Sequence, residues 1–256
     1  MTILLVRHAE SLGNADPDNY MKYATHDLGL TDKGVEQAQA LGSFLKDWYA
    51  HNPPEKNVRL WCSPYRRTFL TMKNMRDTMG AHAWDKCGRG RDVHFDERLR
   101  ERDWGYYTYA DYFHPRTEDA IIPHEFREHF NRHFHSPMGR FFARPMGGES
   151  LADVADRMRS FHHDLFFDIE KGVTDHLIVM HAASMMAFIY ALTKTHPHFM
   201  TDEVFPDNTG VRLLDIDPTT GRFADYGMIY NPENNVYVLN HPERPIQRDM
   251  NTVFAL

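Results

Sequence analysis

The chain has 256 residues, of which 42% are hydrophobic and 25% are charged, and its formal net charge is −7. This composition is typical of an ordinary globular protein and excludes a disordered or fibrous chain. A negative net charge argues against nucleic acid as a partner, because proteins that bind its phosphate backbone are usually basic.

No apolar run approaches the roughly 18 residues that a membrane span needs, so we expect no membrane partner. The first residues pass straight from an apolar run into charged ones without a small-residue cleavage site, so we expect no signal peptide. The two cysteines, Cys62 and Cys87, provide neither a disulfide framework nor metal-ligand spacing. Together these features predict a reduced, cytoplasmic setting.

Predicted strands and helices alternate along the chain. Apolar and β-branched runs predict strands at Thr2–Val6, Val58–Trp61, Leu177–Met180, Val211–Ile216, Tyr226–Ile229 and Val236–Leu239. Apolar residues at helical spacing predict helices from Thr31 or Asp32 to Asn52-Pro53-Pro54, from Ser63-Pro64 to about Gly80 with Phe69, Met72 and Met79 on one face, from Ser150 to Ile169, and through Met185 and Leu192. This order predicts one domain over residues 1–256, a three-layer α/β/α sandwich with a mainly parallel central sheet.

The segment from Gly105 to Met146 lacks this regular pattern. It is dense in His, Phe, Tyr, Arg and Pro residues, and a long irregular insertion in a compact fold is usually a lid or a binding element. We therefore expect a lid at about residues 105–146. His129 and His133 have the spacing of a helical zinc-binding pair, but the nearby glutamates do not complete a metalloprotease signature, so we predict no metal site.

Four clusters of polar residues are predicted to fall where strands end. They are Arg7-His8-Ala9-Glu10, Ser63-Pro64-Tyr65-Arg66-Arg67-Thr68, Leu99-Arg100-Glu101-Arg102-Asp103-Trp104-Gly105 and Met180-His181-Ala182-Ala183. Open α/β sheets bind ligands at the carboxyl ends of their strands. We therefore expect two histidines, at least two arginines and one acid from these clusters to lie close together.

Phosphoryl transfer needs this combination of side chains. Guanidinium groups bind the oxygens of a phosphate monoester with bidentate geometry and stabilise the charge of the transition state. A neutral imidazole can attack phosphorus and form a covalent intermediate. A carboxylic acid can protonate the leaving alkoxide and later activate the attacking water. The set is complete without a metal or another cofactor.

These motifs resemble those of the histidine phosphatase (phosphoglycerate mutase-like) superfamily from Thr2 to about Ile216. The resemblance implies that His8 is the nucleophile, that Glu101 is the general acid and base, and that His181 is the second core histidine. Further matches are Leu30-Thr31-x-x-Gly34-x-x-Gln37-Ala38 and Gly147-Gly148-Glu149-Ser150.

The resemblance also implies the residues that bind the phosphoryl group. Arg7 and Arg67 match its core arginines, with the Ser-Pro-x-x-Arg motif selecting Arg67 over its neighbour Arg66. Arg66 either faces solvent or reaches the tail of the substrate. Asn14 stands where the family often contacts phosphate, and Ala182 follows the second histidine. In the family, glycine usually occupies the positions of Ala9 and Ala182-Ala183, and alanine fits there if φ stays negative.

The resemblance to the phosphatase branch predicts a metal-independent phosphomonoester hydrolase that acts on a small phosphorylated substrate. The segments that mark cofactor-dependent phosphoglycerate mutases are not found in the sequence. Two alternatives stay open, namely a phosphoglycerate-type mutase, which shares every core residue, and a protein that only binds phosphorylated ligands. The sequence does not identify the substrate or the oligomeric state.

Overall fold

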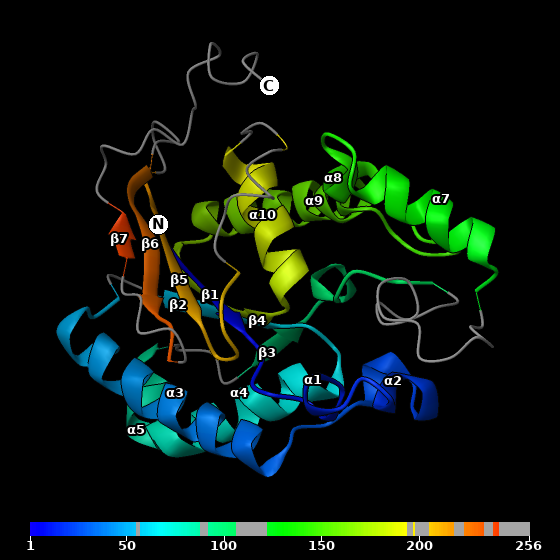
Figure 1. The fold of residues 1–256 in the computed structure, drawn as a ribbon. Coiled ribbons are helices and arrows are strands. Elements are labelled where there is room, and N and C mark those ends of the chain that lie inside the picture. Colours follow the sequence, from blue (N-terminus) through cyan, green and yellow to red (C-terminus); the bar gives the residue numbers. More distant parts are fainter. Residues whose placement is uncertain are drawn as a thin grey trace.

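The computed structural model describes residues 1–54, 57–87, 92–105, 122–193, 197, 205–217, 223–232 and 238–240. Residues 106–121 of the expected lid and most of the chain after residue 232 therefore lie outside the described residues, as do residues 236 and 237 of the last predicted strand. Within the described ranges, seven strands form one sheet in the order β3-β2-β4-β1-β5-β6-β7 (Figure 1).

The sheet has a parallel half and an antiparallel half. The strands are β1 (Thr2–Arg7), β2 (Asn57–Cys62), β3 (Val93–Phe95), β4 (Val173–Met180), β5 (Val211–Ile216), β6 (Phe223–Tyr230) and β7 (Val238–Asn240). β1 to β4 are mutually parallel, whereas β5 pairs antiparallel with β1, and β6 and β7 continue the antiparallel order. Since Val211 pairs with Val6, the start of β5 lies beside the end of β1.

Helices cover both faces of the sheet and confirm the α/β/α sandwich (Figure 1). The helices are α1 (Leu12–Ala15), α2 (Asn19–Lys22), α3 (Asp32–His51), α4 (Arg66–Met79), α5 (Ala81–Cys87), α7 (His124–Phe134), α8 (Gly139–Phe142), α9 (Leu151–Glu170) and α10 (Ala182–Thr193). In β1, Leu4 and Val6 face the core under α3, α4 and α5, whereas Ile3 and Leu5 face the core under α9 and α10. None of the described helices is long and apolar enough to cross a membrane.

The predicted N-terminal capping residues of two helices, α3 and α9, are confirmed. Thr31 caps α3, with its side chain accepting a hydrogen bond from Gly34 N at 3.0 Å. Ser150 and Asp153 form a capping box at the start of α9, because each side chain accepts from the other residue's backbone amide.

Three features of the fold differ from the prediction. β3 and α5 have no predicted counterpart, since a three-residue strand and a seven-residue helix are too short to show a period. β4 starts at Val173, four residues before the predicted strand. Phe69 is 46% exposed rather than on the buried face of α4, and the centroid of its ring lies 6.2 Å from that of Phe95, which is exposed on the edge strand β3.

The described part of the insertion is more regular than expected. α7 and α8 occupy it, and Phe130 of α7 packs in a small cluster with Ile122 and Ala143. Phe126 and Phe142 are exposed. In the described residues, no three His, Cys, Asp or Glu side chains are grouped so that they could hold a metal ion.

Stability should fall at acid pH in part because of His162, which is buried on α9 against the ring of Phe188 at 4.3 Å. Burial lowers the pKa of His162 to about 3, and the charge of Arg159 adds to this effect. In the unfolded chain His162 takes up a proton at about pH 6.5, but in the folded chain it does so only near pH 3. Below pH 6.5 the unfolded state therefore binds more protons, and stability is lost as pH falls toward 3.

We expect His162→Leu to reduce this pH dependence. The slope of unfolding free energy against pH should decrease by up to about 1.4 kcal/mol per pH unit between the two pKa values. Denaturant unfolding at a series of pH values measures it. His163→Leu is the matched control, because His163 is the adjacent residue and is exposed. Equal slopes for the two variants would contradict the assignment.

Candidate active site

Three polar residues follow the carboxyl ends of adjacent parallel strands. His8 follows β1, Ser63 follows β2 and His181 follows β4. The backbone amide of His8 donates to Met180 O at 3.0 Å, and the amide of Ser63 donates to Val179 O at 3.0 Å, so the sheet ladder extends into the site. The rings of His8 and His181 approach to 5.0 Å between centroids. The expected convergence of the strand ends is confirmed in the geometry.

The hydrogen bonds of His8 define its tautomer. Arg67 Nε lies 3.3 Å from His8 Nε2, and a guanidinium nitrogen can only donate, so Nε2 accepts. His8 Nδ1 lies 2.7 Å from Ala9 O and donates to it. Burial lowers the pKa of His8 well below its usual value, and the charges of Arg67 and Arg7 lower it further. At neutral pH, His8 is therefore a neutral imidazole with a lone pair on Nε2.

His181 is fully buried beside His8. Its Nε2 lies 2.9 Å from Ser63 Oγ, and the ring of Tyr65 lies 5.1 Å from its own ring. Burial lowers the pKa of His181, and the positive charge of Arg67 has the next largest effect. Its Nδ1 is buried and has no hydrogen-bond partner in the described structure.

The three candidate arginines differ in their surroundings. Arg67, the second residue of α4, is 1% exposed, and its Nη1 donates to Thr25 O at 2.7 Å. Arg7, the last residue of β1, donates from Nη1 to Pro206 O at 2.7 Å. Arg66 lies on the surface, where it forms a 3.3 Å ion pair with the exposed side chain of Asp27.

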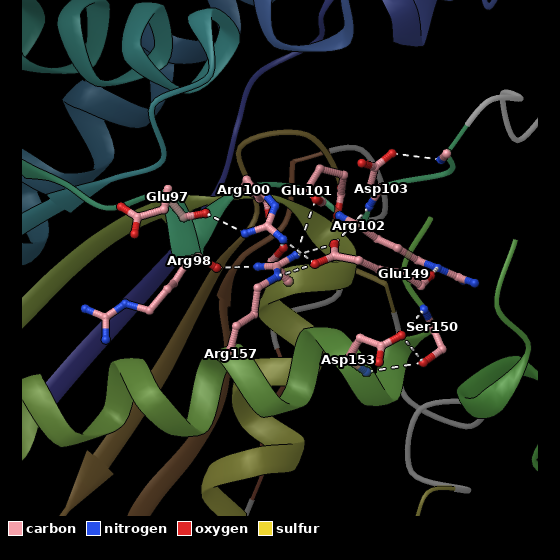
Figure 2. Close-up of polar contacts among 12 residues, drawn as sticks. Glu97, Arg98, Arg100, Glu101, Arg102, Asp103, Glu149, Ser150, Asp153 and Arg157 are labelled. Carbon is pink, nitrogen blue, oxygen red and sulfur yellow. Dashed lines mark hydrogen bonds and ion pairs between the residues drawn. The ribbon is translucent and has the colours of Figure 1, made fainter. Parts of the chain in front are cut away.

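Glu101 lies in the segment between η2 (Glu97–Leu99) and the insertion, and Figure 2 shows it among the charged residues of that segment. Its Oε1 accepts a hydrogen bond from the backbone amide of Arg102 at 2.9 Å. Burial lowers the pKa of Arg67, and the nearby groups of Tyr20 and Glu101 act on this pKa in the opposite direction.

The segment after His8 is held by the Leu30–Ala38 motif. Thr31 N donates to Glu10 O at 3.1 Å, and Glu10 N donates to Gln37 Oε1 at 2.8 Å. A Cβ at Gly34 would lie 2.1 Å from Glu10 O, so only glycine allows α3 to approach this closely. The motif therefore fixes the backbone that leads out of β1 after His8.

Asn14 and Asn208 link this segment to the start of β5. Asn14 Oδ1 accepts from the backbone amide of Ser11 at 3.1 Å, within the capping box of α1. Asn208 Nδ2 donates to His8 O at 3.0 Å and lies 3.4 Å from Asn14 Oδ1. Thr209 follows with φ of +63°, an uncommon conformation for a β-branched residue. Sequence reasoning missed Asn208, although Asp207-Asn208-Thr209-Gly210 is a turn-type run before a buried strand.

Two tyrosines near the buried arginine were also missed. The ring of Tyr65 lies 4.9 Å from Arg67 Cζ, and burial raises the pKa of Tyr65. Tyr20, on α2, has a pKa that is raised by burial, while the charges of Arg67 and Glu101 act on it in opposite directions. The same two charged groups, Arg67 and Glu101, therefore act on the pKa of both phenols.

The alanines at the family's glycine positions fit without strain. In the described chain, the non-glycine residues with positive φ are Met138 and Thr209, so Ala9 and Ala182 have the expected negative φ. Ala182 is buried and begins α10 directly after His181. Burial raises the pKa of the Cys62 thiol to about 12, so this neighbour of Ser63 stays protonated.

Comparisons with known proteins agree with the fold and with the motifs. The family model described as the histidine phosphatase superfamily (branch 1) matches residues 3–228. Phosphoglycerate mutase-like protein AT74 of Arabidopsis thaliana is 30% identical over 236 residues, which make up 88% of this chain and 67% of that protein.

Two solved structures share the architecture. The alpha-ribazole phosphatase from Shigella flexneri has a TM-score of 0.61 at 23% identity, over 85% of this chain and 91% of that one. A mycobacterial glucosyl-3-phosphoglycerate phosphatase in complex with VO3 has a TM-score of 0.59 at 20% identity, over 90% of this chain and 97% of that one. At this identity the likeness shows the fold.

Proposed function

Because this chain belongs to branch 1 of the histidine phosphatase superfamily, we propose that it is a phosphomonoester hydrolase that works through a phosphohistidine on His8. The observation that carries the proposal is the state of His8, a buried neutral imidazole whose Nε2 lone pair faces a buried guanidinium. This combination places a nucleophile next to a binding group for the oxygens of a phosphoryl group.

In the first step, His8 Nε2 attacks phosphorus and the bond from phosphorus to the ester oxygen breaks. Arg7 and Arg67 hold the phosphoryl oxygens and stabilise the charge that develops on them. The ring of His8 becomes positive as the P–N bond forms. The Ala9 carbonyl stabilises this charge because it accepts a hydrogen bond from the Nδ1–H group of the ring. Glu101, in its protonated form, gives its proton to the leaving alkoxide.

In the second step, water replaces His8 on phosphorus. The Glu101 carboxylate takes a proton from the water, whose oxygen attacks phosphorus while the P–N bond breaks. Inorganic phosphate leaves, and His8 and Glu101 return to their starting forms. His181 has an unpartnered Nδ1 beside the nucleophile and is proposed to contact a phosphoryl oxygen in both steps.

The remaining site residues are proposed to bind substrate. The side-chain Nδ2 of exposed Asn14 makes no hydrogen bond in the described structure, so it is available to a phosphoryl oxygen. Ala182 begins a helix, and its backbone N–H faces the end where anions bind. Arg66 is proposed to reach only the tail of a substrate, because it is on the surface. We propose a small phosphorylated molecule as the substrate and one domain over residues 1–256.

A mutase is the second candidate, since the Arabidopsis relative is named as phosphoglycerate mutase-like. A mutase keeps its phosphohistidine and returns the phosphoryl group to the substrate, so it needs the same core residues. The two functions differ in how well water is kept from the intermediate. Measuring isomerised ester against inorganic phosphate, with and without a bisphosphate primer, separates them.

The test is hydrolysis of a panel containing aryl phosphates, sugar phosphates and nucleoside monophosphates, in EDTA, by the wild type and by His8→Ala. We expect release of inorganic phosphate by the wild type in the presence of the chelator and none by the variant, because His8 is the proposed nucleophile. Equal hydrolysis by both proteins, or no turnover of any ester by the wild type, would contradict the proposal.

A further inference from the structure

The segment that carries Glu101 is held by the carboxylate of Glu149, whose side chain is 15% exposed (Figure 2). Arg100 forms an ion pair with Glu149 Oε1, and the backbone amide of Asp103 donates to Oε2 at 3.0 Å. The backbone of Glu149 also contacts this segment, because Glu149 N donates a hydrogen bond to Asp103 O at 2.8 Å. A Cβ at Gly148 would lie 2.5 Å from Asp103 O, so this glycine allows the two segments to pack together.

Arg157 of α9 connects Glu149 to the backbone carbonyls of Arg98 and Glu101. Its Nε and Nη2 each lie 3.1 Å from the carboxylate of Glu149, on different oxygens. The same guanidinium donates from Nη1 to the carbonyl of Arg98 and from Nη2 to the carbonyl of Glu101 at 3.3 Å. One side chain therefore joins the carboxylate, the start of the segment and the backbone of Glu101 itself.

α10 also holds the Glu101 segment, at a backbone carbonyl that lies between those of Arg98 and Glu101 in the sequence. Ser184 is fully buried on that helix, and its hydroxyl donates to the carbonyl of Arg100. The helix starts directly after His181, so the Glu101 segment is tied to the element that follows the second core histidine. The positive charge of Arg157 also contributes to the lowered pKa of His181, after the larger effects of burial, Arg67 and His8, so Arg157 lies near the site.

We propose that Arg157, held by Glu149, is the positioning residue that fixes the Glu101 carboxyl group at the place where it delivers a proton to the leaving group. The inference rests on the proposed function. Arg157 acts through the backbone of Glu101, so it affects general acid catalysis and not the attack by His8.

The geometry of the contacts requires arginine. Four acceptor atoms surround the Arg157 guanidinium, and its three nitrogens reach all of them, with Nη2 shared between Glu149 and the carbonyl of Glu101. A lysine ammonium is a single point that cannot bridge the two oxygens of Glu149 and both carbonyls at once. Misplacement of a catalytic group by about 1 Å is enough to reduce a rate by about 100-fold.

The leaving group of the substrate tests this role. p-Nitrophenyl phosphate has a weakly basic leaving group and needs no general acid, whereas p-nitrobenzyl phosphate has nearly the same shape and releases a strongly basic alkoxide. The ratio kcat/KM reports the steps up to loss of the alcohol, so hydrolysis of the intermediate does not affect it. We expect Arg157→Met to lower kcat/KM for the benzyl ester by about 10- to 100-fold, and for the phenyl ester by less than about threefold.

Three further variants make the result specific. Glu101→Gln with Arg157→Met should be no slower on the benzyl ester than Glu101→Gln alone, because both act on one proton transfer. Ser184→Ala removes the hydrogen bond to the carbonyl of Arg100 with little change of side-chain volume. It should lower kcat/KM for the benzyl ester more than for the phenyl ester, as Arg157→Met does, but by a smaller factor. Arg159→Met is the matched control, since Arg159 lies on the same helix with its charge exposed against Asp156.

Thermal unfolding of each variant accompanies the kinetics, and if Arg157→Met does not fold, Ser184→Ala and Arg157→Lys replace it. Equal losses for the two esters in folded variants, or no loss for either, would overturn the inference while the proposed function stands. Activity that survives His8→Ala would instead overturn the proposed function.

Discussion

Replacing Arg67 with lysine is expected to lower kcat by about 100- to 1,000-fold, the usual effect of removing one oriented donor from a developing oxyanion. The Arg67 guanidinium is buried, already directs Nε at His8 Nε2, and uses Nη1 to hold the Thr25 carbonyl. Lysine keeps the charge but loses the planar fork that fits two phosphoryl oxygens. Steady-state hydrolysis of the best ester from the panel measures the change.

Arg66→Lys is the matched control for this variant. Arg66 is the adjacent residue, but its side chain is exposed and forms an ion pair with exposed Asp27. Exposed pairs of this kind contribute little to stability, and we expect kcat to stay within about twofold of the wild type. If the two variants lose activity equally, the selection of Arg67 over Arg66 is wrong.

Replacing Glu101 with glutamine is expected to have a comparably large effect on esters of alcohols, with a loss of about 100- to 10,000-fold in kcat. Glutamine keeps the shape of the side chain and its amide oxygen can still accept the backbone amide of Arg102, but it has no acidic proton to transfer to the leaving group. The loss therefore reports acid and base chemistry rather than a change of structure. Hydrolysis of p-nitrobenzyl phosphate measures it.

Two neighbouring acids serve as controls, because the sequence alone does not separate them from Glu101. Glu97 is exposed, and Asp103 uses Oδ1 to accept the amide of Gly105 at 2.8 Å. Glu97→Gln should leave kcat unchanged, and Asp103→Asn should lower it modestly. A larger loss of kcat in either control than in Glu101→Gln would show that the assignment of the general acid to Glu101 is wrong.

The sequence predicts the site best where parallel strands end. His8, Ser63 and His181 each follow a run of apolar residues, and parallel strands bring their carboxyl ends to one edge. Asn208 escapes this rule, because it precedes a strand rather than following one. β5 is antiparallel to β1, so its entry lies at the edge where β1 ends, and strand direction is not visible in the apolar pattern.

Other parts of the structure could not be predicted from the sequence, because the elements are too short or because the contact depends on tertiary packing. Tyr20 lies on the four-residue helix α2, which is too short to produce a helical period. The same holds for β3, which has three residues. The Gly147-Gly148-Glu149-Ser150 motif was recognised, but its contact with the Glu101 segment depends on tertiary packing across 46 residues of sequence. A pattern along the chain shows which residues matter and not which of them touch.

Covalent capture of the intermediate tests the central claim most directly. The wild type is mixed with an aryl phosphate, denatured with alkali within one turnover and analysed by peptide mass spectrometry, since a phosphohistidine survives alkali but not acid. We expect one phosphoryl group on the peptide that contains His8, absent in His8→Ala and accumulating in Glu101→Gln. Turnover without any phosphorylated peptide, or a phosphoryl group on a different residue such as Ser63, would contradict catalysis through His8.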